Sequence, residues 1–369
     1  MKSKNLWIVL VIMAGLMISS PAFGRQIVKV PKPGDSLENR FDWALKVASS
    51  SEDFFVGYSV RRLMGEHSSI HCGSFHDDKA GATFEDILAG KENTKRAVKK
   101  ETAKTRKHRE KSRKKVEKDV AILFRYKAGA KKRQAWDSIV IHNTDAIVHL
   151  DTGNIYWLGK LQQDPSVSFL LRLFKENTAI EPRESLITAI SLHDKSPKVV
   201  PFLKKALTGK LPDQLRENAA FWLGNSQAPE AVSILSKTAV DDRSRDVREK
   251  AVFGLYMVES EAAVDTLIHL ARKAPDTEVR KKSIFWLGQK AAKKSAAVLG
   301  DIAQNDSKTD IQKSAIFALS QLPDGQGVPR LIKIAKTHRS LDVRKKALFW
   351  LGQSEDPRAL TLFESILKK

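Results

Sequence analysis

The chain has 369 residues, enough for roughly two or three domains, and carries 64 Lys and Arg against 43 Asp and Glu. The formal net charge of +21 favours acidic partners, such as acidic proteins, anionic lipid or an anionic envelope polymer. The single cysteine, Cys72, excludes an intramolecular disulfide, so the apolar core alone must hold the fold together.

The N-terminus has the pattern of a secretory signal peptide over residues 1–24. Lys2 and Lys4 precede an apolar run of 13 residues, Leu6–Ile18, and small residues then suit cleavage after Gly24. The apolar run is short for a bilayer span, and an uncleaved N-terminal anchor is the alternative. We therefore expect a periplasmic or secreted mature protein, and export argues against nucleic acid as its partner.

The region that follows is predicted as a small α+β region, made of residues 25–90 and 119–163 on either side of an insertion. Apolar, β-branched and aromatic runs indicate its elements. We expect a helix over Leu37–Val47, strands over Phe55–Leu63, Val120–Tyr126, Ser138–His142 and Ala146–Leu150, and a turn over Asp151–Asn154.

A basic insertion is predicted over residues 91–118, where 14 Lys or Arg stand against four Glu. With almost no apolar residues, it cannot join a core. It is either a solubilising charged loop or helix, or an arm that binds anionic lipid or an envelope polymer. The absence of aromatic residues argues against stacking on nucleic-acid bases. The candidate arm residues are Lys99, Lys100, Arg106, Lys107, Arg109, Arg113, Lys114 and Lys115.

One group of residues suggests reactive chemistry: His67, His71, Cys72 and His76. The four-residue spacing of His67 and His71, and of Cys72 and His76, would suit zinc ligands on a helix. However, no paired CxxC or HExxH motif accompanies them, and Gly73 weakens a helix. We therefore predict no metal, no cofactor and no catalytic residue. A metal- or thiol-dependent enzyme with its site in this region remains the alternative.

The C-terminal half contains an internal repeat. Five segments of the type RKKSIFWLG place their phenylalanines 32 residues apart, and a weaker sixth copy begins at Arg183. Each unit is predicted as two amphipathic helices that cannot bury their apolar faces alone. About six such pairs should therefore stack into an α-solenoid over residues 164–369, whose first helix is expected over Val167–Lys175. The fold class is mainly α.

These segments come close to the pattern (D/E)-x-(V/I)-R-x-x-A-(I/V)-x-x-L-G. Glu278–Gly288, for example, lacks the x between its acidic and aliphatic residues and has serine at the alanine position. The pattern resembles the short HEAT-like type of the HEAT-repeat family, over roughly residues 165–369. The resemblance implies a curved scaffold that binds proteins or peptides. It also implies that an arginine near the start of each first helix ties adjacent repeats together. Those arginines are Arg216, Arg248, Arg280 and Arg344, and Gln312 departs from the pattern.

The repeated phenylalanines form the candidate binding site. Counted from the arginine position, the core residues fall at −1, +3, +4 and +7, and the phenylalanine falls at +5, roughly opposite them. The rings either form an exposed apolar strip for a partner or pack sideways between neighbouring first helices. The strip comprises Phe221, Phe253, Phe285, Phe317 and Phe349, flanked by Lys281, Lys282, Lys345 and Lys346. The sequence thus predicts an exported, non-catalytic scaffold for a protein or peptide partner.

Overall fold

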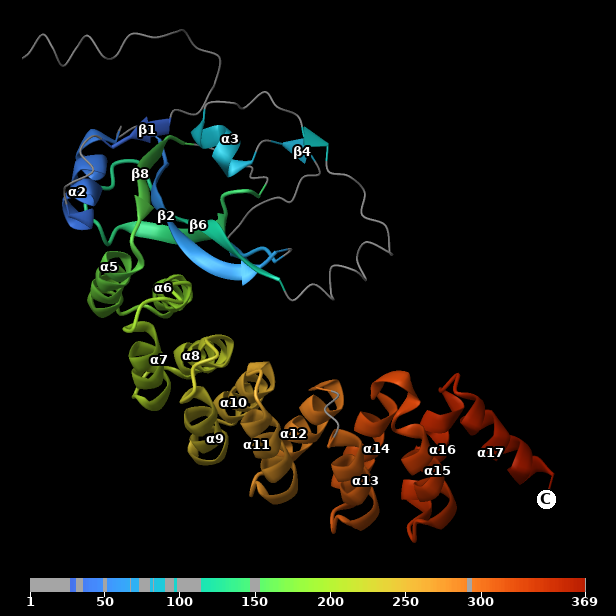
Figure 1. Cartoon of the computed structure of the whole chain (residues 1–369). Coiled ribbons are helices and arrows are strands. Elements are labelled where there is room, and N and C mark those ends of the chain that lie inside the picture. Colours follow the sequence, from blue (N-terminus) through green and yellow to red (C-terminus); the bar gives the residue numbers. More distant parts are fainter. Residues whose placement is uncertain are drawn as a thin grey trace, which may run out of the picture.

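The computed structural model describes residues 27–30, 36–48, 52–66, 68–72, 80–81, 83–89, 96–97, 114–146, 153–290 and 294–368. A sheet region at the N-terminal end leads into a row of helices that extends away from it (Figure 1). Within these ranges, no helix has the length and apolar character that a membrane crossing requires. The predicted signal peptide and the arm residues from Lys99 to Arg113 lie outside the described residues.

Six strands form a mixed sheet in the order β1-β8-β2-β6-β7-β3. Strand β8 runs parallel to both β1 and β2, and the other neighbours are antiparallel. The strands are β1 (Ile27–Lys29), β2 (Phe54–Gly65), β3 (His71–Cys72), β6 (Lys115–Tyr126), β7 (Trp136–Asn143) and β8 (Ile155–Leu161). A separate two-stranded pair joins β4 (Ala80–Gly81) to β5 (Arg96–Ala97).

Both faces of the sheet are buried, which explains its nearly continuous apolar strands. Side chains alternate along β6, so Ile122 and Phe124 face one core and Leu123 faces the other. Helices α2 (Leu37–Val47) and α5 (Gln163–Glu176) cover the first face, and α3 (Phe84–Leu88) covers the second. Phe41 of α2 anchors the first core, with its ring centroid 5.3 Å from that of Phe124.

The helix predicted over Leu37–Val47 is confirmed, and three of the four predicted strands fall within β2, β6 and β7. The fourth predicted strand, Ala146–Leu150, is not confirmed, because Ala146 lies in a bend and residues 147–150 lie outside the described residues. The sequence prediction also missed β8, in the interior of the sheet, where Gly159 at φ +82° interrupts the strand pattern.

The predicted end of the basic insertion at residue 118 is wrong, because β6 already begins at Lys115. Residues 115–118 pair with Arg62–Gly65 of β2 along a ribbon that continues the sheet. Their charged side chains disfavour an isolated strand, so the conformation comes from pairing with β2. Lys115 therefore belongs to the sheet, and Lys114 lies beside its end, 3.4 Å from Glu66.

Beyond α5, six helical pairs form the solenoid, which confirms the predicted fold class. The helix predicted over Val167–Lys175 is α5, which begins four residues earlier, at Gln163, and precedes the six pairs. The first helices of the pairs are α6 (Ile180–Ser191), α8 (Asp213–Asn225), α10 (Arg245–Met257), α12 (Thr277–Lys290), α14 (Thr309–Ser320) and α16 (Leu341–Gly352). The second helices are α7 (Val199–Thr208), α9 (Ala231–Asp241), α11 (Glu261–Lys273), α13 (Ser295–Asn305), α15 (Val328–Thr337) and α17 (Pro357–Leu367).

The predicted core positions of the first helices are confirmed in α10. Val247, Ala251, Val252 and Leu255 stand at −1, +3, +4 and +7, and all four are fully buried. Neighbouring first helices approach closely near their C-terminal ends, where a Cβ on Gly224 would lie 2.5 Å from the carbonyl oxygen of Gly254. The first helices lie on the side of the solenoid nearer the sheet region (Figure 1).

The sheet region and the solenoid share one continuous apolar core and are joined by buried hydrogen bonds. Ser166 of α5 lies 2.8 Å from the hydroxyl of Tyr58 and 2.8 Å from His193 Nε2. His193 Nδ1 donates to the carbonyl of Ala189 at 2.9 Å, so Nε2 is the acceptor. Burial lowers the pKa of His193 to about 4, which keeps the ring neutral. We call Tyr58, Ser166 and His193 the seam.

Candidate partner-binding groove

The repeated phenylalanines lie along one side of the first helices, and their rings pack against those of neighbouring repeats. Phe221 stacks on Phe253 at a centroid distance of 6.1 Å, and Phe285 stacks on Phe317 at 6.4 Å. Trp286 connects these two pairs, with its ring 4.8 Å from both Phe253 and Phe285. The rings therefore pack sideways between first helices, which is one of the two arrangements predicted from the sequence.

The sideways packing does not remove the rings from solvent. Four of the five phenylalanines are half-buried, and Phe349 at the C-terminal end is 53% exposed. The tryptophans of the same helices and Tyr256 are also half-buried. We call this connected set the aromatic column; it comprises Trp222, Phe221, Phe253, Tyr256, Trp286, Phe285, Phe317, Trp350 and Phe349.

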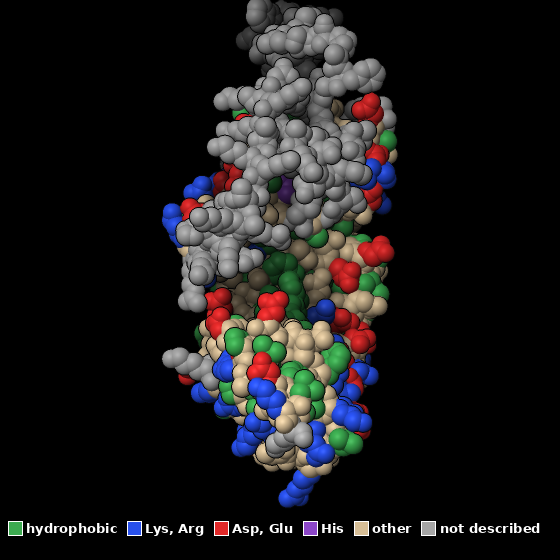
Figure 2. All heavy atoms as spheres, turned by 90° about the vertical axis from the view of Figure 1, so that its right-hand side faces the viewer, with side chains coloured by type: hydrophobic (Ala, Val, Ile, Leu, Met, Phe, Trp, Pro, Cys, Tyr) green, Lys and Arg blue, Asp and Glu red, His purple; other side chains and the backbone are tan. Residues whose placement is uncertain are grey.

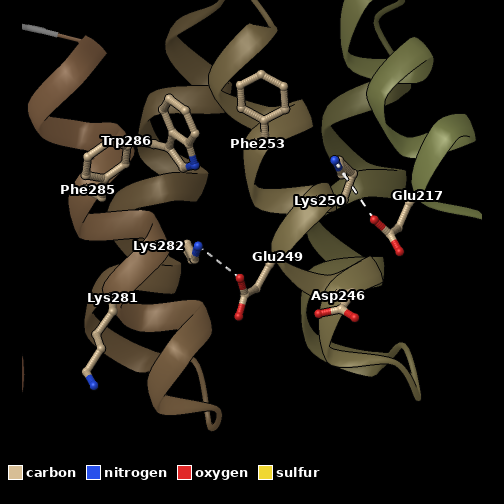
Figure 3. A pocket seen from close by; sticks show the side chains of 9 residues that line it. All are labelled: Glu217, Asp246, Glu249, Lys250, Phe253, Lys281, Lys282, Phe285 and Trp286. Carbon is tan, nitrogen blue, oxygen red and sulfur yellow. Dashed lines mark ion pairs between the residues drawn. The ribbon is translucent and has the colours of Figure 1, made fainter. Parts of the chain in front are cut away.

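The column lines a groove between neighbouring first helices. Its main cavity, of about 650 Å³, has Phe253, Phe285 and Trp286 along one side and charged side chains along the other (Figure 3). The charged lining residues are Glu217, Asp246, Glu249, Lys250, Lys281 and Lys282. A smaller hollow of about 290 Å³ shares Glu217 and Lys250 and extends toward α6. We call the two together the first-helix groove.

The whole molecule is hollowed between the sheet region and the solenoid. Figure 2 shows hydrophobic side chains on the floor of this hollow, with acidic side chains and a basic one along its lower and right-hand edges. An apolar floor within a charged rim is the usual composition of a surface that binds another molecule.

The lysines predicted to flank the rings lie beside them, and several form ion pairs. Lys282 pairs with Glu249 at 3.1 Å across neighbouring helices, and Lys281 pairs with Glu278 at 3.1 Å on its own helix. The ammonium group of Lys346 lies 5.2 Å from the ring centroid of Phe349 and 5.4 Å from that of Trp350. Lys345 is exposed to solvent. Such pairs are weakly held and can exchange with the charges of a partner.

Two glutamates of the groove have opposite electrostatic environments. Burial raises the pKa of Glu217, and the nearby carboxylates of Asp246, Asp213 and Glu184 raise it further, against the effect of Lys250. Burial also acts on Glu249, but hydrogen bonds from Lys282 and Arg245 outweigh it and lower the pKa of that carboxyl. Burial is therefore the main cause of the raised pKa of Glu217, and ion pairing is the cause of the lowered pKa of Glu249.

The arginines at position zero have the structural role that the resemblance implied. Arg216 pairs with Asp213 at 2.5 Å and also with Asp242, which precedes the next first helix. Arg280 pairs in the same way with Asp306 and donates to the carbonyl of Ala271 at 3.0 Å. These buried pairs hold consecutive repeats together and lie outside the groove lining.

The repeat that has Gln312 in place of the arginine at position zero also lacks the aspartate that pairs with that arginine. Where Arg216 and Arg280 meet an aspartate 26 residues later, Gln312 meets His338, with Nε2 atoms 3.2 Å apart. An amide and an imidazole thus replace the guanidinium and the carboxylate of the other repeats. Asp242, Asp306 and His338 stand at multiples of 32 residues, so this exchange was visible in the sequence, although the prediction did not use it.

The candidate metal residues are only partly described. His67 and His76 lie outside the described residues, and the backbone of His71 pairs with His142 in the sheet. His71 and Cys72 are therefore on a strand and not on the helix that a four-residue ligand spacing requires. Cys72 is exposed, but neighbouring atoms partly desolvate its thiol and raise its pKa, whereas a nucleophilic cysteine needs a lowered one. Among the described side chains, no three His, Cys, Asp or Glu could hold a metal ion.

Several groove residues were not predicted from the sequence. Glu217, Asp246, Glu249 and Lys250 line the cavity, whereas the residues predicted from the sequence are the phenylalanines and the lysines of two repeats. The available signal was the same 32-residue period, because the residues at +1 and +2 of every first helix stand beside the phenylalanine at +5.

The stacked helical pairs and the groove along their first helices define an α-solenoid repeat protein. A family model described as HEAT repeats matches residues 200–288 and 296–369. This part of the chain is therefore made of HEAT repeats. No curated protein matches the chain.

Several solved structures are similar to the solenoid. A chain of the complex of CpcE and CpcF of phycocyanin lyase from Nostoc is 26% identical, covers 43% of this chain and all of its own, and has a TM-score of 0.33. YibA from Escherichia coli is 18% identical over 52% of this chain and 70% of its own, with a TM-score of 0.31. Human deoxyhypusine hydroxylase is 16% identical over 55% and 77%, with a TM-score of 0.25.

Proposed function

We propose that the protein is a non-catalytic scaffold that binds a protein or peptide partner in the first-helix groove. The solenoid fold of HEAT repeats is typical of protein-binding scaffolds. The observation that carries the proposal is the aromatic column, whose connected and half-exposed rings run across five first helices.

The packing of the column supports this role energetically. Half-exposed aromatic rings can bury further apolar area against a partner, and Trp and Tyr are frequent binding hot spots. Each ring is already held by its neighbours, as Trp286 is held between Phe253 and Phe285. Binding therefore costs little additional side-chain entropy, which favours affinity.

A pair of variants tests the proposal. Peptides are selected from a random library on the wild-type protein and then measured against Phe253→Ser/Phe285→Ser. The control is Phe202→Ser on α7, a half-buried ring that packs on Phe174 at 5.0 Å on the other side of the repeat. We expect the groove variant to bind at least about tenfold more weakly, because each ring contributes on the order of 1 kcal/mol. Equal affinities for the wild type and a folded groove variant would refute the groove as the binding site.

We also propose that the protein is exported and that residues 1–24 are removed. The proposal is supported by the charged, apolar and small-residue segments of that stretch. Cell fractionation followed by mass spectrometry should find a mature N-terminus at Arg25 in the envelope or secreted fraction. A full-length protein in the cytoplasmic fraction would contradict it.

The basic segment is proposed to contact anionic lipid or an envelope polymer. Its support is the excess of basic residues from Lys99 to Lys115. Because β6 begins at Lys115, the test deletes residues 98–113 and leaves the sheet whole. We expect the deletion to abolish salt-sensitive binding to anionic vesicles. Unchanged binding would reduce the segment to a solubilising loop.

A further inference from the structure

The first-helix groove changes its charge along the solenoid at one repeat position. The residue directly after position zero is Glu184 in α6, Glu217 in α8 and Glu249 in α10, and then a lysine in every later repeat. Those lysines are Lys281 in α12, Lys313 in α14 and Lys345 in α16. Three acidic repeats are thus followed by three basic ones, although the rings at +5 continue through the change.

Position +1 alone carries this division. Position −2 is acidic in both halves, with Asp246, Glu278, Asp310 and Asp342, and at position +2 the basic half has Lys282 and Lys346 while the acidic half has Lys250. In the acidic half, Lys250 lies 3.9 Å from Glu217, too far for a strong ion pair. The charge around Glu217 is therefore incompletely neutralised within the protein.

The main cavity lies at the point where the charge changes. Its lining takes Asp246 and Glu249 from α10 and Lys281 and Lys282 from α12, with Trp286 beside them (Figure 3). The smaller hollow is lined by Glu184, Glu217 and Lys250, all from repeats that have glutamate at +1. A ligand lying along the groove would therefore meet carboxylates, then aromatic rings with both charges, then lysines.

We propose that the groove binds a bipolar segment of a protein partner, with basic residues against α6–α10, an apolar residue over the cavity and acidic residues against α12–α16. This inference rests on the proposed function and specifies its ligand. Complementary charges in this order fix the orientation and register of the segment, while the rings supply apolar contact. Helices pack on the order of 10 Å apart, so α8 to α14 span ~30 Å, or about nine extended residues.

The test uses two fluorescein-labelled 12-residue peptides of identical composition. One places a lysine block and a glutamate block on either side of a central tryptophan, and the other alternates the same charges. We expect the block peptide to bind the mature protein at least about tenfold more tightly by fluorescence anisotropy, with a difference that decreases as salt increases.

A charge-reversal variant tests whether the lysines of the groove distinguish the block peptide from the alternating peptide. Lys313→Glu/Lys345→Glu should abolish the preference for the block peptide. Lys333→Glu/Lys336→Glu makes the same charge change at exposed positions of α15, on the second helix of its repeat, and should keep the preference.

The outcomes separate this inference from the proposed function. Equal affinity for the two peptides would overturn the bipolar segment but not the scaffold function. The same holds if neither peptide binds while library-selected peptides still bind. Failure of every peptide in the groove overturns both. Self-association that the charge-reversal variant abolishes, without any preference for the block peptide, would assign the two charged halves to a second copy of the chain and overturn the inference.

Discussion

The sheet region and the solenoid differ in how their contacts relate to the sequence. In the sheet, Ile27 pairs with Ile155 and Gly65 with Lys115, so the fold depends on segments far apart in the chain. In the solenoid, each first helix contacts mainly the helices beside it, as α10 contacts α8, α9 and α12. The sheet buries both of its faces, whereas the solenoid keeps one side of its first helices half-exposed. The half-exposed aromatic surface that we propose for a protein partner is therefore on the solenoid.

The largest effect is expected where the repeats are tied together. Arg216→Ala leaves the carboxylate of Asp242 buried without its guanidinium partner, which should cost about 3–5 kcal/mol of unfolding free energy. Gln312→Ala removes only a neutral hydrogen bond to His338 and should cost about 1 kcal/mol. Urea unfolding followed by circular dichroism gives both values. Equal losses would show that the ion pairs are not what holds consecutive repeats together.

The seam between the two regions should make stability depend on pH. The folded pKa of His193 is about 4, below its ordinary 6.5, so the unfolded chain takes up a proton first as the pH falls. The contribution of the neutral ring is complete above pH 6.5 and is lost progressively toward pH 4. Between pH 7 and pH 5 the loss should be about 2 kcal/mol.

The matched variant for this pH dependence is His193→Gln, which cannot titrate. Urea midpoints at pH 7 and pH 5 should differ much less in the variant than in the wild-type protein. The same difference in both proteins would place the titrating group elsewhere.

The smallest expected effect compares two adjacent arginines of β2. Arg62 reaches the solenoid, donating to the carbonyl of Ser191 at 3.3 Å and to Asn225 at 3.1 Å. Arg61 pairs with Asp119 within the sheet, exposed to solvent. Arg62→Ala should cost about 1–2 kcal/mol in thermal or urea unfolding, and Arg61→Ala should cost less, because its ion pair is exposed to solvent. A larger loss at Arg61 would mean that Arg62 does not couple the two regions.

The solenoid was largely predictable because the same structural unit recurs in the sequence every 32 residues. The sheet was only partly predictable. Residues 115–118, three of which are charged, become a strand only by pairing with β2, and β8 contains Gly159 in a left-handed conformation. Such features depend on tertiary contacts that no local pattern contains.

The candidate site was predictable in its position and not in its detail. The period places the phenylalanines on one side of the first helices, but their half-burial depends on the tryptophan of a neighbouring repeat, as Trp350 packs on Phe317 at 5.0 Å. The change from glutamate to lysine at position +1 is present in the sequence. Its significance is clear only once these side chains are seen to line one groove.

The most direct test of the account is to map where a bound peptide lies. A library-selected peptide carrying a photoreactive group is cross-linked to the mature protein, and the adducts are located by mass spectrometry. The account predicts adducts on the first helices, centred on α10 and α12 near Phe253 and Phe285. Adducts confined to the second helices or to the sheet region would contradict it.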